Sequence, residues 1–191
     1  MIFRLFRRDP QGATITGLYG AIVAHARLPA FYLAFAVADT PEGRFELLVL
    51  HLALVCRRLG RAAGAEQPAA RALSQGIFDT FCRDMDHSLR EMGVGDLSVP
   101  KKMRKLGEAF YGRLEAYDRA LASADPAELA AALGRNAQAP GAPRAATQRL
   151  AAYVRAAAAR LEALPVAHLR DGQVSFPDPT TISETVCEAS A

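Results

Sequence analysis

The sequence has 191 residues and a net charge of +3, with 51% hydrophobic residues, 7% aromatic residues and no tryptophan. This length suits one domain with a substantial core, and an apolar fraction dominated by alanine, leucine and valine favours helices. The excess of positive charge is smaller than in a dedicated nucleic-acid-binding domain, so no DNA partner is expected.

The first thirteen residues, 1–13, form a basic amphipathic segment. Apolar side chains alternate with arginines between Ile2 and Arg8, but the segment lacks the apolar stretch and cleavage site of a secretory signal. Apolar anchors beside cations are the features that hold a peptide at an anionic membrane surface. Weak membrane contact is one interpretation, and a frayed or core-docked terminus is the other.

Apolar residues at helical spacing predict an all-α domain over residues 14–164, a single bundle of about six to seven helices. We find no internal repeat and no alternation strong enough to predict a sheet. Residues 165–191 show no helical period and are expected to form an extended or disordered tail. The predicted helices span 14–26, 30–37, 41–59, 69–92, 100–123, 126–133 and 150–164.

The third predicted helix is apolar almost all round, which is typical of a helix at the centre of a bundle. Asp39 or Thr40 can cap it, and Pro41 suits its first position. His51 lies among leucines on this helix. A core histidine with a hydrogen-bonded neighbour is one interpretation, and ligation of a cofactor is the other.

A tight corner is predicted after the fourth helix. Its apolar stripe, which should face a core, consists of Phe78, Phe81, Met85, Leu89 and Met92. Gly93 then falls where a left-handed residue ends a helix, and Val94 is placed to pack back on Leu89. Pro100 starts the next helix, since it is favoured at the first helical position.

Both sides of this corner are rich in charge. Asp84, His87 and Glu91 share one stripe of the fourth helix, and Asp86 and Arg90 form an i, i+4 pair. A solvated flank, an interaction surface and a metal or proton-transfer site are the three interpretations of this stripe.

The start of the fifth helix is basic, although the helix dipole favours acidic groups there. The cations are Lys101, Lys102, Arg104 and Lys105. Either water solvates these cations and weakens their unfavourable interaction with the helix dipole, or an anionic partner binds this patch.

No complete catalytic or metal-binding motif is present. Cys56, Cys82 and Cys187 lie far apart without CxxC spacing, which argues against disulfides and zinc sites. No catalytic residue, metal or cofactor is therefore assigned. The apolar stretches are shorter than a membrane span needs, so we expect a soluble cytoplasmic protein in a reducing compartment. Peripheral contact with the inner membrane is the alternative location.

Two segments resemble the ubiquinol cytochrome c chaperone family. They are DTPEGRFELLVLHLALVCRRL at 39–59 and DMDHSLREMGVGDLSVPKKMRK followed by EAFYGR at 84–113. The resemblance implies an all-helical, non-enzymatic assembly factor that holds newly made cytochrome b, a subunit of respiratory complex III, near the membrane. The richness in alanine and arginine indicates a bacterial member, so the ribosome contact of mitochondrial relatives is not carried over to this chain as an expectation.

The family's signature turn places the candidate partner-binding residues at the corner. By this resemblance they include Asp84, Asp86, Arg90, Glu91, Asp96 and Lys101, with Gly93, Gly95 and Pro100 shaping the turn. The charge pattern adds His87, Lys102, Arg104 and Lys105 to the candidates.

Two alternative functions remain open at this point. One is a helical protein that binds haem or a quinone, with His51 or His87 as ligand. The other is an RNA- or ribosome-binding module that uses the basic helix start.

Overall fold

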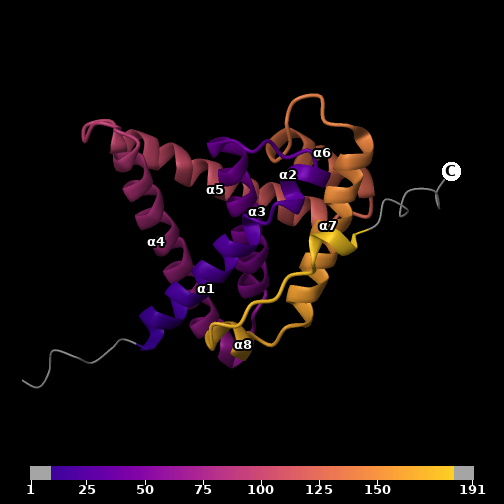
Figure 1. The fold of residues 1–191 in the computed structure, drawn as a ribbon. Helices are drawn as coiled ribbons and strands as arrows, with labels where there is room; N and C mark the ends of the chain where they lie inside the picture. Colours follow the sequence, from indigo (N-terminus) through magenta and orange to yellow (C-terminus); the bar gives the residue numbers. More distant parts are fainter. Residues whose placement is uncertain (1–9, 183–191) are drawn as a thin grey trace, which may run out of the picture.

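The computed structural model describes residues 10–182, and within that range every regular element is a helix. The predicted all-α fold is confirmed, with six longer helices and two of five residues in the described part. Figure 1 shows their arrangement. The α-helices are α1 Pro10–Ala26, α2 Ala30–Ala34, α3 Pro41–Gly60, α4 Gln67–Glu91, α5 Val99–Ala122, α6 Pro126–Asn136, α7 Arg144–Ala163 and α8 Val166–Arg170, and the 3₁₀ turns are η1 Gly64–Glu66 and η2 Pro179–Thr181.

Helix α3 is the centre of the molecule, as its apolar surface predicts. Every residue from 47 to 56 is buried, and α3 packs against α1, α4, α5 and α7. Its start is capped by Thr40, whose Oγ1 accepts a hydrogen bond from the Gly43 amide at 3.2 Å. Asp39, the other predicted cap, instead pairs with Arg44 at 2.7 Å.

The remaining helices form two groups around α3 (Figure 1). Helices α4 and α5 diverge from a corner at one side of the molecule, with α1 packed along α4. Helices α6 and α7 stand on the other side and pack on each other. Gly76 allows α1 to approach α4 closely, because a Cβ there would lie 2.4 Å from Ile15 Cδ1.

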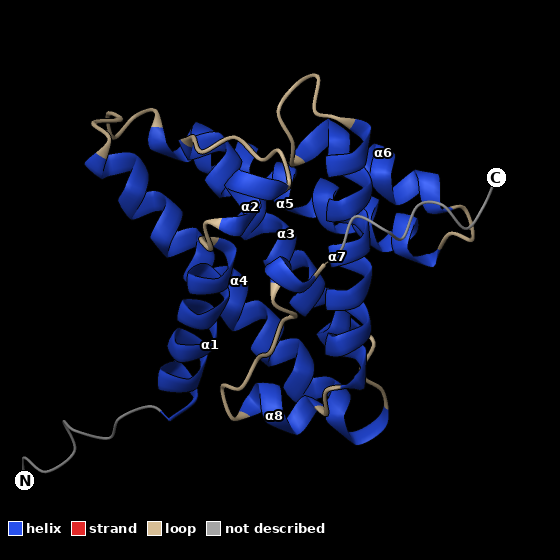
Figure 2. Ribbon diagram, turned by 45° about the vertical axis from the view of Figure 1, so that its right-hand side comes forward, coloured by secondary structure: helices blue, strands red, loops and turns tan. Residues whose placement is uncertain are grey.

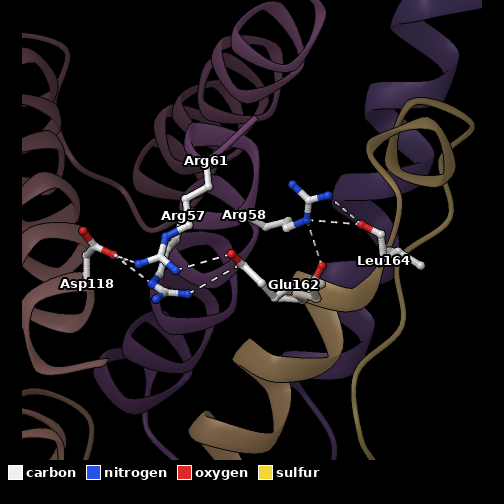
Figure 3. Close-up of polar contacts among 7 residues, drawn as sticks. Arg57, Arg58, Arg61, Asp118, Glu162 and Leu164 are labelled. Carbon is white, nitrogen blue, oxygen red and sulfur yellow. Dashed lines mark hydrogen bonds and ion pairs between the residues drawn. The ribbon is translucent and has the colours of Figure 1, made fainter. Parts of the chain in front are cut away.

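The carboxyl end of α3 is tied to α5 and α7 by arginines (Figure 3). Arg57, only 10% exposed, pairs with Asp118 of α5 at 2.8 Å and with Glu162 of α7 at 3.8 Å. Arg58 donates to the Leu164 carbonyl from Nη2 at 2.8 Å, so it satisfies a carbonyl at the end of α7. These contacts link the end of α3 to α5 and α7.

The chain beyond Pro165 is only partly the extended or disordered tail that the sequence predicts. Residues 166–170 form α8, whereas residues 171–182 are irregular apart from η2 and run back over the bundle. Val166, Leu169 and Pro179 are buried, and Phe176 stacks on His25 with ring centroids 4.7 Å apart. The segment shows no helical period because its apolar side chains are fixed by tertiary contacts, not by one helix face. Residues 183–191 lie outside the described part.

The amino-terminal boundary also differs from the prediction. Helix α1 begins at Pro10, whereas the apolar period predicted a start at Thr14. Helix period is a weak guide to a first turn, since that turn needs no buried side chain. The proposed lipid-contact segment, Ile2 to Arg8, lies outside the described residues.

Candidate partner-binding surface

The corner between α4 and α5 has the geometry that the sequence predicts. Gly93 has a φ of +78°, the Gly93 amide donates to the Arg90 carbonyl at 2.9 Å, and the Val94 amide donates to the Leu89 carbonyl at 3.0 Å. These two bonds are those of a Schellman motif. Pro100 lies in the first turn of α5, one residue after its start at Val99. Gly95 serves the turn through its carbonyl, which accepts from the Ser98 amide at 2.8 Å.

The corner projects from the rest of the molecule and is not sunk in the core. Figure 2 shows the loop between α4 and α5 at the far end of both helices, away from α6, α7 and α8. Leu97 is 98% exposed and Met92 is 65% exposed. The expectation that Met92 faces a core is wrong, because the helix has already passed the edge of the bundle at this point.

The acidic half of the corner lies on α4 and in the loop. Arg90 pairs with Asp86 at 2.7 Å and also with Asp96, so one guanidinium joins the helix to the loop. This contact with Arg90 lowers the pKa of the Asp86 carboxyl. His87 and Glu91 lie within 3.1 Å of each other and both are exposed. These five side chains therefore form one continuous charged surface.

Asp84 is set apart from the other acidic candidates. It is half-buried, and its Oδ2 accepts a hydrogen bond from the Tyr19 hydroxyl at 2.6 Å. Burial and this bond both raise the pKa of Tyr19, which therefore stays protonated and keeps donating. The side chain of Asp84 docks α1 on α4, a role that the stripe of polar residues did not reveal.

The basic half lies on the first two turns of α5. Lys101, Lys102, Arg104 and Lys105 are all exposed. Arg104 pairs with Glu108 at 3.1 Å, whereas no carboxylate among residues 10–182 pairs with the three lysines. No acidic residue occupies the first turn to offset the helix dipole. The lysine charges therefore face solvent.

An aromatic groove lies between α3, α4 and α5, with a volume of about 320 Å³. Phe78 and Phe110 form part of its wall with ring centroids 4.9 Å apart, and Tyr111 beside them is 55% exposed. The free thiol of Cys56 is buried against this groove, and burial raises its pKa. Tyr111 could not be singled out from the sequence, because a helical period does not show which apolar residue lies beside a groove.

His51 is a core histidine with both ring nitrogens in use. Its Nδ1 lies 2.7 Å from the Leu47 carbonyl, so Nδ1 carries the proton and donates. Its Nε2 then accepts from the Tyr153 hydroxyl at 2.7 Å. Burial lowers the pKa of His51 to about 3. A haem or metal ligand needs a free ring nitrogen, and this arrangement leaves none.

Two further features of residues 10–182 bear on the metal-site and membrane interpretations. No group of three or more histidine, cysteine, aspartate or glutamate residues in this range is arranged to hold a metal ion. No helix in the same range is long and apolar enough to cross a membrane. The structure thus defines an all-α protein with a projecting charged corner and an aromatic groove between α3, α4 and α5.

The chain belongs to the ubiquinol-cytochrome c chaperone family, whose sequence model matches residues 33–176. This range contains the corner and the aromatic groove. A crystal structure of the Cbp3 homolog from Brucella abortus has 42% sequence identity and a TM-score of 0.82, over 96% of this chain and 100% of that one. The bundle and its projecting corner therefore belong to a fold already seen in a crystal.

The name of a more distant relative states a function. Ubiquinol-cytochrome-c reductase complex assembly factor 1 from Xenopus laevis is 26% identical over 119 residues, which cover 62% of this chain and 57% of the relative. The matched part thus spans a little over half the length of that relative.

Proposed function

We propose that this protein is a non-enzymatic assembly factor that binds newly made cytochrome b and assists assembly of the ubiquinol-cytochrome c oxidoreductase, respiratory complex III. Membership of the chaperone family and the name of the Xenopus laevis relative support the assembly role. In this proposal the protein acts in the cytoplasm, at the periphery of the inner membrane.

The observation that carries the proposal is the projecting charged corner. A rigid frame of packed helices holds Asp86, Arg90, Glu91 and Asp96 in the open, where they contribute little to the core. Exposed charges outside the core are available to fix the orientation of a protein partner. The Asp84 carboxylate already accepts a hydrogen bond from Tyr19, so we propose the remaining candidates of α4 and the loop as the surface that recognises the protein partner, namely Asp86, His87, Arg90, Glu91 and Asp96.

The aromatic groove is the proposed site for an apolar segment of the client. A newly made membrane subunit exposes apolar helices, and such helices bind grooves lined by aromatic and aliphatic side chains. Phe78, Phe110, Tyr111 and Leu114 provide this lining, with Arg71 and Gln75 at the edge. The charged corner would then select the partner, and the groove would shield its apolar surface.

Photo-crosslinking in cells tests the proposed partner. A photoreactive residue at Glu91 or Tyr111 is expected to capture cytochrome b. The same residue at the exposed Arg144, the first residue of α7, is expected not to. Deletion of the gene should lower the amount of assembled complex III while the cytochrome b transcript is unchanged. Normal levels of the assembled complex in the deletion strain would contradict the assembly role.

A further inference from the structure

The lysines of this chain are distributed in an unusual way. Lys101, Lys102 and Lys105 are the only lysines in the sequence, and the other 20 basic residues are arginines. Many arginines elsewhere in the fold donate to carboxylates or carbonyls, as Arg113 does to Glu46 at 2.7 Å. Arginine suits such fixed, directional contacts, whereas a lysine ammonium is a flexible and strongly hydrated point charge. The chain thus places its mobile cations together at the corner.

The corner also holds two of the most exposed apolar side chains of residues 10–182. Leu97 is 98% exposed and Met92 is 65% exposed, on the two sides of the same short loop. An isolated exposed leucine needs no explanation, but two apolar side chains beside three unpaired cations form a distinct surface. We call this set, Met92, Leu97, Lys101, Lys102 and Lys105, the corner tip.

The fold holds Leu97 outward. The Gly95 carbonyl accepts from the amides of Ser98 at 2.8 Å and Val99 at 3.3 Å, which closes a turn with Leu97 near its apex. Val99, only 1% exposed, anchors the end of this turn in the interior. The ion pair between Asp96 and Arg90 ties the loop to α4. The exposure of Leu97 is therefore built into an ordered loop.

We propose that the corner tip docks on the surface of an anionic lipid bilayer. Leu97 and Met92 enter the boundary between headgroups and acyl chains, and the three lysines contact lipid phosphates, since these two signals together hold a protein at a membrane. The acidic charge nearby is partly offset within the protein, because Arg90 pairs with both Asp86 and Asp96, and His87 lies 3.1 Å from Glu91. The phosphate backbone of RNA offers no apolar region in which a protruding leucine could be buried. A lipid surface does, so we favour it as the partner.

This docking goes beyond the proposed chaperone function and gives the proposed peripheral location a contact surface. The aromatic groove lies on the same two helices, about 20 Å from the tip, because Phe78 stands 14 residues before Met92 and an α-helix rises about 1.5 Å per residue. The flank of α4, with His87 and Glu91, would remain open to a protein.

Vesicle binding by the purified full chain tests the proposal. We expect binding to phosphatidylcholine vesicles only when they contain phosphatidylglycerol. Replacing all three lysines by glutamine should weaken this binding about 100-fold. Leu97→Ser should weaken it about 10-fold, while Leu33→Ser, at an 85% exposed residue of α2 away from the corner, should leave it unchanged.

The lysines also provide a direct readout of the contact. Because all side-chain amines lie at the tip, amine-selective methylation followed by peptide mass spectrometry reports on this surface alone. Anionic vesicles should protect the three lysines. Unchanged methylation, or binding that is lost only on replacing Arg4, Arg7 and Arg8, would overturn the proposal. So would lysine-dependent binding to RNA with no effect of Leu97→Ser on vesicles. None of these measurements depends on the assembly of complex III.

Discussion

At the scale of single residues, the centre of the fold is a polar network in an apolar setting. The Tyr153 hydroxyl donates to His51 Nε2, so it accepts from His25 Nε2 at 2.9 Å. Three helices, α1, α3 and α7, contribute one side chain each. Burial lowers the pKa of both histidines, although Asp178 acts in the opposite direction on His25. Protonation of His51 would require this network to break.

The network predicts a loss of stability at mildly acidic pH. Unfolded His51 binds a proton as the pH falls below 6.5, its ordinary pKa, while folded His51 stays neutral down to about 3. The unfolded state is therefore favoured as the pH falls, by about 2 kcal/mol between pH 7 and pH 5 from His51 alone. Urea unfolding at the two pH values measures this loss.

The variant His51→Gln isolates that contribution. The free energy of unfolding falls between pH 7 and pH 5 in both proteins. In the variant this fall should be smaller by about 2 kcal/mol, because the contribution of His51 is absent. His25 still contributes to the remaining fall. His168→Gln, at an exposed histidine, should retain the wild-type fall. An equal fall in His51→Gln and wild type would show that His51 does not titrate as the burial requires.

At the scale of elements, the corner depends on Gly93, which ends α4, and on Pro100, which lies in the first turn of α5. Gly93 adopts a left-handed conformation, and Pro100 has no amide proton that the first turn of α5 would leave unpaired. Both features follow from local backbone chemistry, which is why they were predictable from the sequence. The exposure of Leu97 was not, since nothing in a short loop identifies which side chain points outward.

Two glycine substitutions distinguish the corner from an ordinary helix position. Gly93→Ala forces a side chain into the left-handed region and should lower the free energy of unfolding by about 1 kcal/mol. Gly112→Ala lies inside α5 with nothing within 4 Å of the new Cβ, and should raise it by about 0.5 kcal/mol or more. Urea denaturation of both variants provides the measurement. A Gly93→Ala protein as stable as the wild type would contradict the assigned helix ending.

At the scale of the whole molecule, the bundle is closed by its last described residues. Val166 and Leu169 of α8 and Pro179 of η2 are buried, and Phe176 packs on the ring of His25. Figure 1 shows this segment running from α8 back along α7. The family match ends at residue 176, within this segment.

A truncation tests this role. A chain that ends at Pro165 should be several kcal/mol less stable than a chain that ends at Ile182, because each buried side chain contributes roughly 1.5–3 kcal/mol. That loss is comparable to the total stability of a domain. Thermal unfolding followed by circular dichroism compares the two chains. Equal midpoints would mean that the contacts of residues 166–182 add nothing to the stability of the bundle.

The sequence by itself determined the all-α class, the central position of α3 and the geometry of the α4–α5 corner. Each of these follows from local causes: the apolar surface of a helix, a cap at Thr40, and the backbone freedom of Gly93 and the restriction of Pro100. Its charge pattern also located the exposed candidates on both sides of the corner.

Only the tertiary structure decided the remaining features. It joined Asp84 to Tyr19 across 65 positions of the sequence, buried α8 and the segment after it, and opened a groove beside Tyr111. These depend on side chains that meet from distant parts of the chain. Local periodicity carries no information about such long-range contacts. The burial of a residue depends on which distant side chains pack against it.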